Sequence, residues 1–502
     1  MSGQTTPAVP FTQVPAGLLV PMFYVEMSTA LTTPGTAAPT VLLIGQATAA
    51  NAEAPVYVAS VAAAQAMFGV GSQLANMVAA YRGADPLTQV WALPLADATS
   101  ATKATGQIIV GGSPTQNGTL ALYVGGTLVN VPVVAAQTSA QVASAIQAAI
   151  AAVPTLPVSA SVSLSTVTLT ANNAGTLGND CPIVLNYLGP RGGQVTPAGL
   201  TITVTQMSGG ATDPTLSATS LAAAVGQTPY DVIVNPYAAS GLAATTGLLA
   251  NQGGRWSPEA QIYGHAITAS RAAPATLIAA AGALNDPHLT YLGVNINSPT
   301  PAWLWAPAFA GAIYPSLQNQ PNQPLYSLPI PGVLPEPAGS EIGWSNQQAL
   351  LAAGCALATR TATGGAAVLR AVTTYLTNAA GVPDQSAYLD TERLFTLVAV
   401  MRRLRNYVLS TFGRALLAAN GTPTANGIGA PIATPTIVKN GLIGEYQRME
   451  AAGLVQNASA FAQALSVQPN PTDSTRLDVL YQPDLVSGLY IFAVLNQFYS
   501  AA

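Results

Sequence analysis

The sequence predicts an α/β core that is interrupted by an inserted β-rich domain and followed by an α+β C-terminal domain. Strand patterns alternate with helical patterns before residue 112 and again after residue 208, a rhythm typical of parallel strands joined by helical crossovers. Residues 112–208 instead contain mostly strand patterns and only two charged residues, Asp180 and Arg191. Charge is concentrated near the end, where 16 of the 34 charged residues lie between Asp384 and Asp484.

The core is expected in two segments, residues 28–111 and 209–383. Short apolar runs predict its strands, and apolar residues at helical spacing predict its helices. The expected strands are Val41–Gly45, Gln89–Leu93, Asp231–Asn235, Ala260–Ile267, Leu289–Asn295, Cys355–Thr361 and Ala367–Thr373. The expected helices are Val61–Phe68, Ser72–Tyr81, Leu216–Val225, Gly241–Gln252, Ala275–Ala283, Trp303–Tyr314 and Ser345–Leu351. A proline-rich loop, Pro315–Pro337, is expected before the last helix.

The inserted domain is expected at residues 112–208. It begins at the turn-forming sequence Gly111-Gly112-Ser113-Pro114, which marks a boundary. Its expected helix, Ser139–Ala152, has Thr138 or Ser139 in position to cap it. The expected strands are Leu120–Val124, Leu128–Val134, Val158–Leu164, Val167–Thr170 and Leu200–Val204.

The C-terminal domain, residues 384–484, is organised around a long helix that starts near Tyr388. Asp390 is the expected N-cap, and Asn420-Gly421 is the expected stop. Apolar residues at helical spacing form a continuous stripe along this helix: Leu394, Leu397, Met401, Leu404, Val408 and Phe412. The other expected elements are a helix, Val438–Ala452, and a strand, Arg476–Tyr481.

Both termini are expected to be extended arms. Residues 1–27 hold four prolines, a density that prevents a helix and suits an extended edge segment. The other arm, residues 485–502, contains a strand pattern, Leu489–Tyr499, that is apolar on both faces and must be covered on both. The pattern leaves two alternatives open: a central strand of its own domain, or a strand inserted into another sheet, such as that of a neighbouring copy. The candidate arm residues are Phe23, Tyr24, Val25, Tyr490, Phe492, Val494 and Phe498.

The bulk composition favours a chain that assembles with copies of itself. Charged residues make up 7% of the chain, against roughly 25% in an average soluble domain. A surface buried between copies avoids charge, because burying an unpaired ion is expensive. The alternative is an extracellular surface protein, although the start of the chain lacks the charged segment of an export signal. The net charge of −4 provides no basic field for nucleic acid, and no long purely apolar stretch predicts a membrane span.

The sequence carries few motifs of binding chemistry. Lys103 and Lys439 follow Thr and Val, whereas a phosphate-binding loop requires glycine before its lysine. Cys181 and Cys355 lie far apart and lack the spacing of metal ligands or a disulfide framework. Neither a cofactor nor a bound metal is therefore expected.

One enzymatic alternative depends on the two histidines, His265 and His288. His265 is expected near the end of a strand, with Asp231 in the same sheet, and strand ends are where α/β enzymes place catalytic groups. An α/β hydrolase would have to use this pair, but none of the usual nucleophile motifs accompanies it. A hydrogen-bonded structural histidine is the simpler interpretation.

The basic cluster of the long helix, Arg402, Arg403 and Arg405, is the candidate site for a charged partner. At about 100° per residue, Arg405 falls roughly 40° from Met401, inside the apolar stripe. It is therefore expected to need a carboxylate or carbonyl partner, within the chain or across an interface. Arg402 and Arg403 would suit an acidic partner surface; the alternative is a solvated helix face.

Four collinear stretches resemble the contractile tail sheath proteins of Mu-like bacteriophages. They are FTQVPAGLLVPMFYVEMS, MFGVGSQLANMVAAYRGADPLTQVWALPLAD, YLDTERLFTLVAVMRRLRNYVLSTFGR and RLDVLYQPDLVSGLYIFAVLNQF. They cover both halves of the core and both termini. Residues 112–208 resemble the variable outer domain of that family less specifically.

The resemblance implies a structural protein without enzymatic activity, whose core has a subtilisin-like fold. It implies stacked hexameric rings around a tail tube, with terminal arms that complete a sheet in a neighbouring copy. The C-terminal domain would touch the tube protein through charged residues, and baseplate and tail terminator proteins would be further partners. The sheath would assemble in the host cytoplasm, become part of the virion, and contract to drive the tube through the host envelope. A hydrolase using His265 and a self-assembling surface-layer protein are the competing hypotheses.

Overall fold

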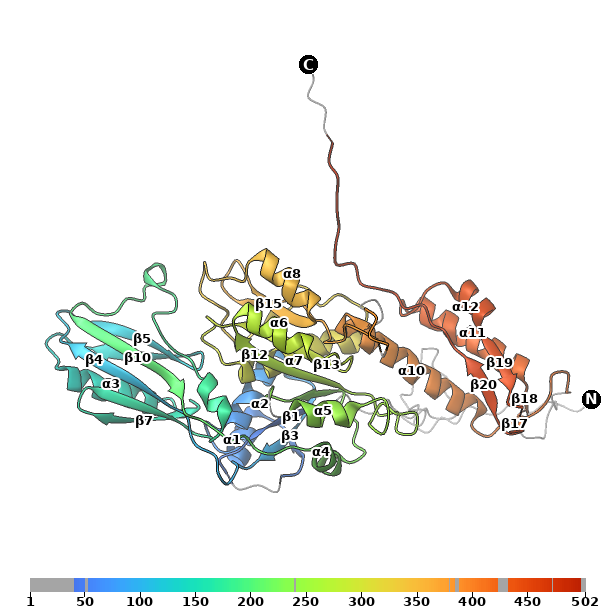
Figure 1. Ribbon diagram of the computed structural model, residues 1–502, viewed down its shortest axis with the longest axis horizontal. Helices are drawn as coiled ribbons and strands as arrows, with labels where there is room; N and C mark the ends of the chain where they lie inside the picture. The colour runs from blue at the N-terminus through green and yellow to red at the C-terminus, as the bar shows by residue number, and fades with distance from the viewer. Residues whose placement is uncertain are drawn as a thin grey trace, which may run out of the picture. The chain divides into compact units, whose positions relative to one another are not determined.

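The computed structural model describes residues 40–49, 53–238, 241–378, 380–383, 388–422, 432–471 and 473–497 (Figure 1). The chain divides into two units, residues 1–39 and 40–502, and the described residues all belong to the second. The expected N-terminal arm, with Phe23, Tyr24 and Val25, lies outside the described residues, as does Phe498.

A nine-stranded mixed sheet forms the core of the described unit. In sheet order its strands are β14 (Pro329–Ile330), β16 (Ala366–Arg370), β15 (Cys355–Arg360), β13 (Leu289–Asn295), β12 (His265–Ala272), β11 (Val232–Val234), β1 (Thr40–Gln46), β3 (Gln89–Leu95) and β2 (Val56–Val58). Neighbours from β15 to β3 pair in parallel, whereas β14, β16 and β2 pair antiparallel at the two ends. The parallel pairs confirm the crossovers expected from the alternation of strands and helices.

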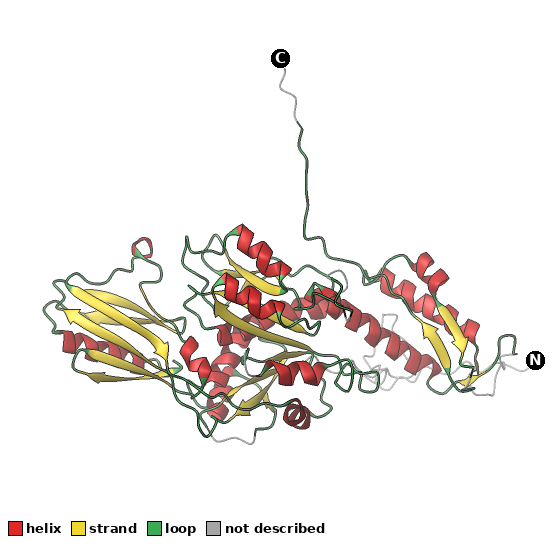
Figure 2. Cartoon of the chain, in the orientation of Figure 1, coloured by secondary structure: helices red, strands yellow, loops and turns green. Residues whose placement is uncertain are grey.

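Helices cover both faces of this sheet, because its central strands are apolar on both faces. In β1, Val41 and Leu43 belong to one hydrophobic core, and Leu42 and Ile44 belong to another. The first core includes side chains of α1 (Val61–Phe68), α2 (Gln73–Ala84) and α7 (Ala302–Asn319). The opposite face is covered by α4 (Ala218–Val225), α5 (Leu242–Leu249), α6 (Pro274–Gly282) and α8 (Trp344–Ala352). The red helices and yellow strands of Figure 2 show these elements.

Residues 105–208 form two antiparallel sheets and a helix around a hydrophobic core of their own. One sheet contains, in order, β10 (Leu200–Ser208), β4 (Thr105–Gly112), β8 (Thr166–Ala171) and β7 (Val158–Ser163). The other contains β6 (Thr127–Val133), β5 (Gly118–Val124) and β9 (Ile183–Leu185). Thr138, one of the two expected caps, begins α3 (Ser139–Ala151) in a capping box with Gln141. Two short 3-10 helices, η1 (Thr176–Asp180) and η2 (Pro190–Gly192), connect the strands.

The described residues from Thr391 to Leu480 contain three helices and two small sheets. Its helices are α10 (Thr391–Phe412), α11 (Pro435–Ala451) and α12 (Ala458–Ala464). One sheet pairs β17 (Leu416–Leu417) with β18 (Ile432–Ala433), and the other pairs β19 (Ser466–Pro469) with β20 (Leu477–Leu480). Buried residues of α10, α11 and α12 share one hydrophobic core, in which the Tyr446 and Phe461 rings stack with centroids 3.7 Å apart.

Most expected helices and strands of the core are present, but two expectations there are wrong. Helix α7 continues through Pro315 to Asn319, where a loop was expected to begin. A proline removes one helical hydrogen bond, and the burial of Tyr314 and Leu317 on either side of it outweighs that loss. Strand β12 begins at His265 instead of running from Ala260 to Ile267.

Further differences lie outside the core. Strand β4 was not expected, because glycine occupies a buried position, Gly106, and hides the apolar alternation. Helix α10 ends at Phe412 rather than at Asn420, because Leu416–Leu417 pairs as β17. Residues 489–497 form no strand with any described residue.

Replacing Leu292 by alanine tests the packing of the core. Leu292 is fully buried on β13, and its truncation should lower the free energy of unfolding by about 2–5 kcal/mol. The matched control is Leu87→Ala: Leu87 is 91% exposed, and the change should stay within about 0.5 kcal/mol. Chemical denaturation of the unassembled chain measures both, and equal losses would contradict the packing.

Candidate interaction site

An open apolar groove lies between α10, α11 and β20. It has room for about 440 Å³, and its lining contains no charged side chain. The lining residues are Met401, Leu404, Val408, Phe412, Ala415, Leu417, Ala433, Val438, Leu442, Thr475, Leu477, Val479 and Tyr481. A surface of this chemistry favours an apolar occupant over water.

The sequence produces the groove from two regular patterns. Met401, Leu404 and Val408 lie three and four residues apart, so they share one face of α10. Leu477 and Val479 are two residues apart, so they share one face of β20. The apolar stripe expected on the long helix therefore does not close into a core along its whole length; Val408 remains 38% exposed.

The two small sheets border this groove. Leu417 of β17 and Ala433 of β18 belong to its lining, as do Leu477 and Val479 of β20. Each sheet has only two strands, an arrangement that is marginally stable by itself in water. Among the described residues no further strand pairs with either sheet, so each keeps a free edge beside the groove.

The C-terminal segment carries exposed apolar side chains, which are of the kind that an apolar groove favours as occupants. Residues 491–497 are exposed, and Figure 1 draws them as an extended trace without helix or strand. The exposed fractions are 77% for Ile491, 83% for Phe492, 71% for Val494 and 84% for Leu495. The pattern that predicted a strand covered on both faces thus lies on a segment that its own described fold does not cover.

The basic cluster separates into two environments. Arg402 forms an ion pair with Asp231, which also accepts a hydrogen bond of 2.6 Å from the Tyr314 hydroxyl. Arg403 and Arg405 are exposed, and no ion pair joins either to an acid in the described part of the chain. The expected burial of Arg405 in the apolar stripe is wrong. The stripe borders an open groove there, so a long side chain at its rim reaches solvent.

His265 lies where an α/β enzyme would not place its catalytic base. It opens β12, and Asp231 immediately precedes β11, so both stand at the amino ends of parallel strands. Catalytic groups of open α/β sheets gather at the carboxyl ends. His265 is buried, and its Nε2 lies 2.8 Å from Oγ1 of Thr290. The expectation that His265 stands near a strand's functional end is therefore wrong.

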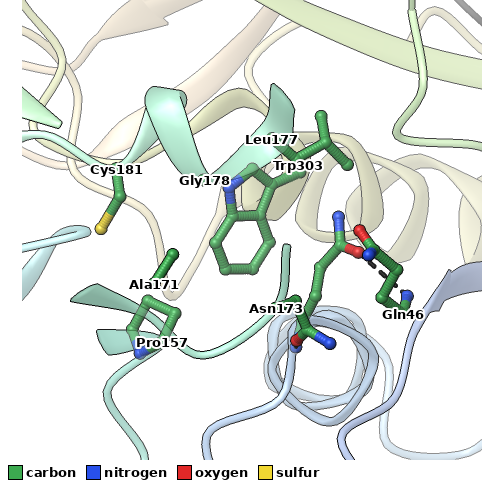
Figure 3. A pocket seen from close by; sticks show the side chains of 9 residues that line it. Gln46, Pro157, Ala171, Asn173, Leu177, Gly178, Cys181 and Trp303 are labelled. Atoms are coloured by element: carbon green, nitrogen blue, oxygen red, sulfur yellow. Dashed lines mark hydrogen bonds between the residues drawn. The ribbon is translucent and has the colours of Figure 1, made fainter. Parts of the chain in front are cut away.

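The pocket in Figure 3 is too small for a substrate. It has room for about 20 Å³, close to the size that one water molecule needs. Gln73 and Trp303 line it, and the Gln46 amide donates a 2.9 Å hydrogen bond to Oε1 of Gln73. The indole Nε1 of Trp303 and Nε2 of Gln73 have no protein partner among the described residues. These polar atoms suit a bound water rather than a reaction.

Two other classes of site are absent from the described ranges. No three side chains of His, Cys, Asp or Glu come together there in a way that holds a metal ion. No helix there is long and apolar enough to cross a membrane. Both Cys181 and Cys355 are buried as free thiols.

Comparison with known proteins identifies relatives along the whole chain. The family model of the phage tail sheath protein central domain matches residues 209–374. The Mu-like prophage FluMu tail sheath protein of Haemophilus influenzae is 34% identical over 496 residues, which cover 98% of this chain and 99% of that protein.

Solved structures give weaker matches. The helical sheath of the anti-feeding prophage in its contracted state is 10% identical, with a TM-score of 0.48, over 95% of this chain and 99% of that chain. The sheath tail protein of Desulfitobacterium hafniense is 12% identical, with a TM-score of 0.42, over 93% and 100%.

The full-length relative decides the identity, because the two chains align from end to end at 34% identity. The chain therefore belongs to the phage tail sheath proteins, as a Mu-like member, and is a structural sheath subunit.

Proposed function

We propose that this protein polymerises by lodging the C-terminal segment of one copy in the apolar groove of the next. The observation that carries the proposal is that one chain has an apolar segment and an apolar groove with sheet edges, and that no described residue covers the segment, fills the groove or pairs with those edges. An extended segment that adds a strand to an exposed edge gains main-chain hydrogen bonds and side-chain burial together.

The geometry of such a contact favours an open-ended array. The donor segment and the acceptor groove are different surfaces of the chain, so the contact is heterologous. Heterologous contacts generate rings where the rotation closes and helical arrays where it does not. Stacked hexameric rings wound around a tail tube, the arrangement that the family resemblance implies, combine a closed ring with a helical array.

We propose the following domain layout for the subunit. Its parts are an N-terminal arm (1–27), a discontinuous α/β core (28–111 and 209–383), an inserted domain (112–208), an inner C-terminal domain (384–484) and a C-terminal arm (485–502). Separate hydrophobic cores support an inserted domain and a C-terminal domain; the first core includes Ala104, Ile108 and Val110, so it favours a start of the inserted domain near residue 104 instead of 112. The parallel sheet with helices on both faces is compatible with a subtilisin-like core.

Other sheath partners would meet other parts of the subunit. The exposed Arg403 and Arg405 are our candidates for contact with the tail tube protein, since their guanidinium groups are free to pair with acidic residues. Arg402 is committed to Asp231 within the chain and is the weaker candidate. Baseplate and tail terminator proteins would bind the two ends of the polymer, which assembles in the host cytoplasm and becomes part of the virion.

Contraction would then be a switch between two packings of a rigid subunit. The arms keep copies connected while each subunit rotates and moves outward, and the contracted sheath drives the tube through the host envelope. The energy is stored in the assembled sheath, so the mechanism requires no bound nucleotide and no enzymatic step.

The competing hydrolase hypothesis requires a histidine that can act as a general base. Burial lowers the pKa of His265 to about 3 and the pKa of His288 to about 4. A general base works best when its pKa lies near the operating pH. Both imidazoles are therefore neutral at pH 7 and poorly matched to that role.

Acid titration tests the state of the two histidines. In the unfolded chain a histidine has a pKa of about 6.5, so below that pH the unfolded state takes up protons that the folded state does not. Their contribution to stability is therefore lost as pH falls from about 6.5 towards 3 to 4. The variant His265→Gln/His288→Gln should show a shallower fall in unfolding free energy across that range; identical slopes would contradict it.

Strand exchange is tested by disabling donor and acceptor separately. A chain ending at Tyr490 lacks the donor, and Leu404→Asp with Val479→Asp places two charges in the acceptor groove. Neither should form tubes in electron micrographs. The truncated chain has no segment to donate, and in the groove variant burying an unpaired carboxylate is strongly unfavourable. Both should remain folded by circular dichroism.

The control for the added charges is Leu87→Asp, on a side chain that is 91% exposed, which should form normal tubes. Tubes of normal length from the chain ending at Tyr490 would overturn the proposed exchange.

A further inference from the structure

The residues just before the free segment are attached to their own chain. We define residues 484–490 as the strap. At its start the strap pairs with the C-terminal domain: the Gln456 amide donates to the carbonyl of Asp484 over 2.9 Å, and the Val486 amide donates to the carbonyl of Leu454 over 3.2 Å. The Asp484 amide also donates to the hydroxyl of Tyr446, over 3.0 Å.

At its far end the strap contacts the start of α10 and the core. Arg393 donates a 2.6 Å hydrogen bond to the Ser487 hydroxyl. A Cβ at Gly488 would stand 2.7 Å from Cγ of Pro324, so only glycine allows the chain to pass this close. The strap thus links the C-terminal domain to the core on the way to the free segment.

Tyr490 is the last residue of the strap and its most firmly held side chain. Its hydroxyl donates a hydrogen bond to Oε1 of Glu392 and accepts one of 3.3 Å from the Leu325 amide. The guanidinium of Arg370 lies over its ring, 4.6 Å from the centroid. Asp390 holds that guanidinium with bonds of 2.8 and 3.1 Å.

The two neighbours of Tyr490 show how local this attachment is. Leu489 is 74% exposed and Ile491 is 77% exposed, so the side chains on either side of Tyr490 are in water. The residues that follow, 492–497, are exposed as well. The boundary between the attached and the free chain therefore falls at one residue.

Glu392 is buried to an unusual degree for a carboxyl group. It is only 3% exposed, and Oε2 has no hydrogen-bond partner among the described residues. Burial raises the pKa of this carboxyl to about 7. A carboxyl oxygen accepts the Tyr490 hydroxyl in either protonation state, so the contact itself does not require the charge.

We propose that Tyr490, seated on Glu392 and Arg370, is the anchor at which the arm pivots and through which a neighbour's pull enters the subunit. The exchanged part of the arm then begins at Ile491, and residues 484–490 stay with their own chain. A pull on the arm is transmitted to the start of α10 through Glu392 and to β16 through Arg370. The role in force transmission rests on the proposed strand exchange, whereas the anchored strap stands on the contacts within one chain.

The hydroxyl of Tyr490 is the group to remove. Tyr490→Phe keeps the ring over Arg370 and loses the two hydrogen bonds of the hydroxyl, the one to Glu392 and the one from the Leu325 amide. Loss of an ordinary hydrogen bond corresponds to about a two- to tenfold larger opening of the strap. Hydrogen exchange in the peptide 484–490 of the unassembled full-length chain should accelerate by that factor.

Three comparisons separate anchoring from general damage. Tyr326→Phe, on a tyrosine that is 59% exposed, should exchange in 484–490 like the natural chain. Glu392→Gln keeps an acceptor oxygen and should stay protected, whereas Glu392→Ala should not. Unchanged protection in Tyr490→Phe, or lost protection in Glu392→Gln, would overturn the anchor.

Force transmission is measured in the polymer. Sheaths of Tyr490→Phe should show more breaks after contraction in electron micrographs than those of Tyr326→Phe, and equal continuity would overturn this part. Normal assembly of the chain ending at Tyr490 would overturn the proposed strand exchange. The hydrogen-exchange rates of the peptide 484–490 in the unassembled chain would still decide whether Tyr490 is an anchor.

Discussion

Apolar side chains that their own fold leaves in water are the constraint on which this account depends. Phe492 and Leu495 are more than four-fifths exposed, and burying a side chain of this size stabilises a structure by about 1.5–3 kcal/mol. A groove of matching chemistry stands open on the same chain. In the proposed exchange, a subunit built in this way is completed by association, so its polymerisation would follow from the same hydrophobic effect that folds the core.

Part of the scarce charge of the chain forms three ion pairs that join elements of the subunit. Arg271 pairs with Asp180 over 2.7 Å, linking β12 to the end of η1, and Arg402 pairs with Asp231. The pair between Arg370 and Asp390 links β16 to the start of α10. All three pairs are partly or largely shielded from water and join elements far apart in the sequence, where breaking a pair is costly. The charges in these pairs hold the subunit's own helices and strands together, which leaves much of its surface uncharged.

An apolar sequence pattern predicts the structure best where residues of the same chain cover the apolar face that it forms. The strands around Val41 and Leu292 were predictable because apolar runs in a parallel sheet are covered on both faces by the chain's own helices. The apolar stripe of α10 was predictable too, but not that Val408 would border an open groove, because periodicity marks a face and not its occupant. Arg405 was misplaced for the same reason.

The candidate site was predictable only in part. The pattern at Leu489–Tyr499 indicated a strand needing cover, and Ile491 and Val494 are exposed among the described residues; that a neighbouring copy covers them stays a prediction. Tyr490 was expected to be exchanged with the rest of the arm. Its contacts with its own chain gave no sequence signal, because Glu392, Arg370 and Leu325 approach it only through the tertiary fold. His265 was placed at the wrong end of its strand, since the turn at residues 257–262 delays the start of β12.

Cross-linking between two chains that each carry one engineered, exposed cysteine tests the central claim most directly. One chain carries Val494→Cys on the arm and the other carries Val479→Cys in the groove, while the native Cys181 and Cys355 are buried. When the two chains are assembled together and treated with a short thiol cross-linker, the account predicts a covalent dimer of the two. No dimer from the mixture, together with an internal cross-link in a chain carrying both changes, would contradict it, because the arm would then fill the groove of its own chain.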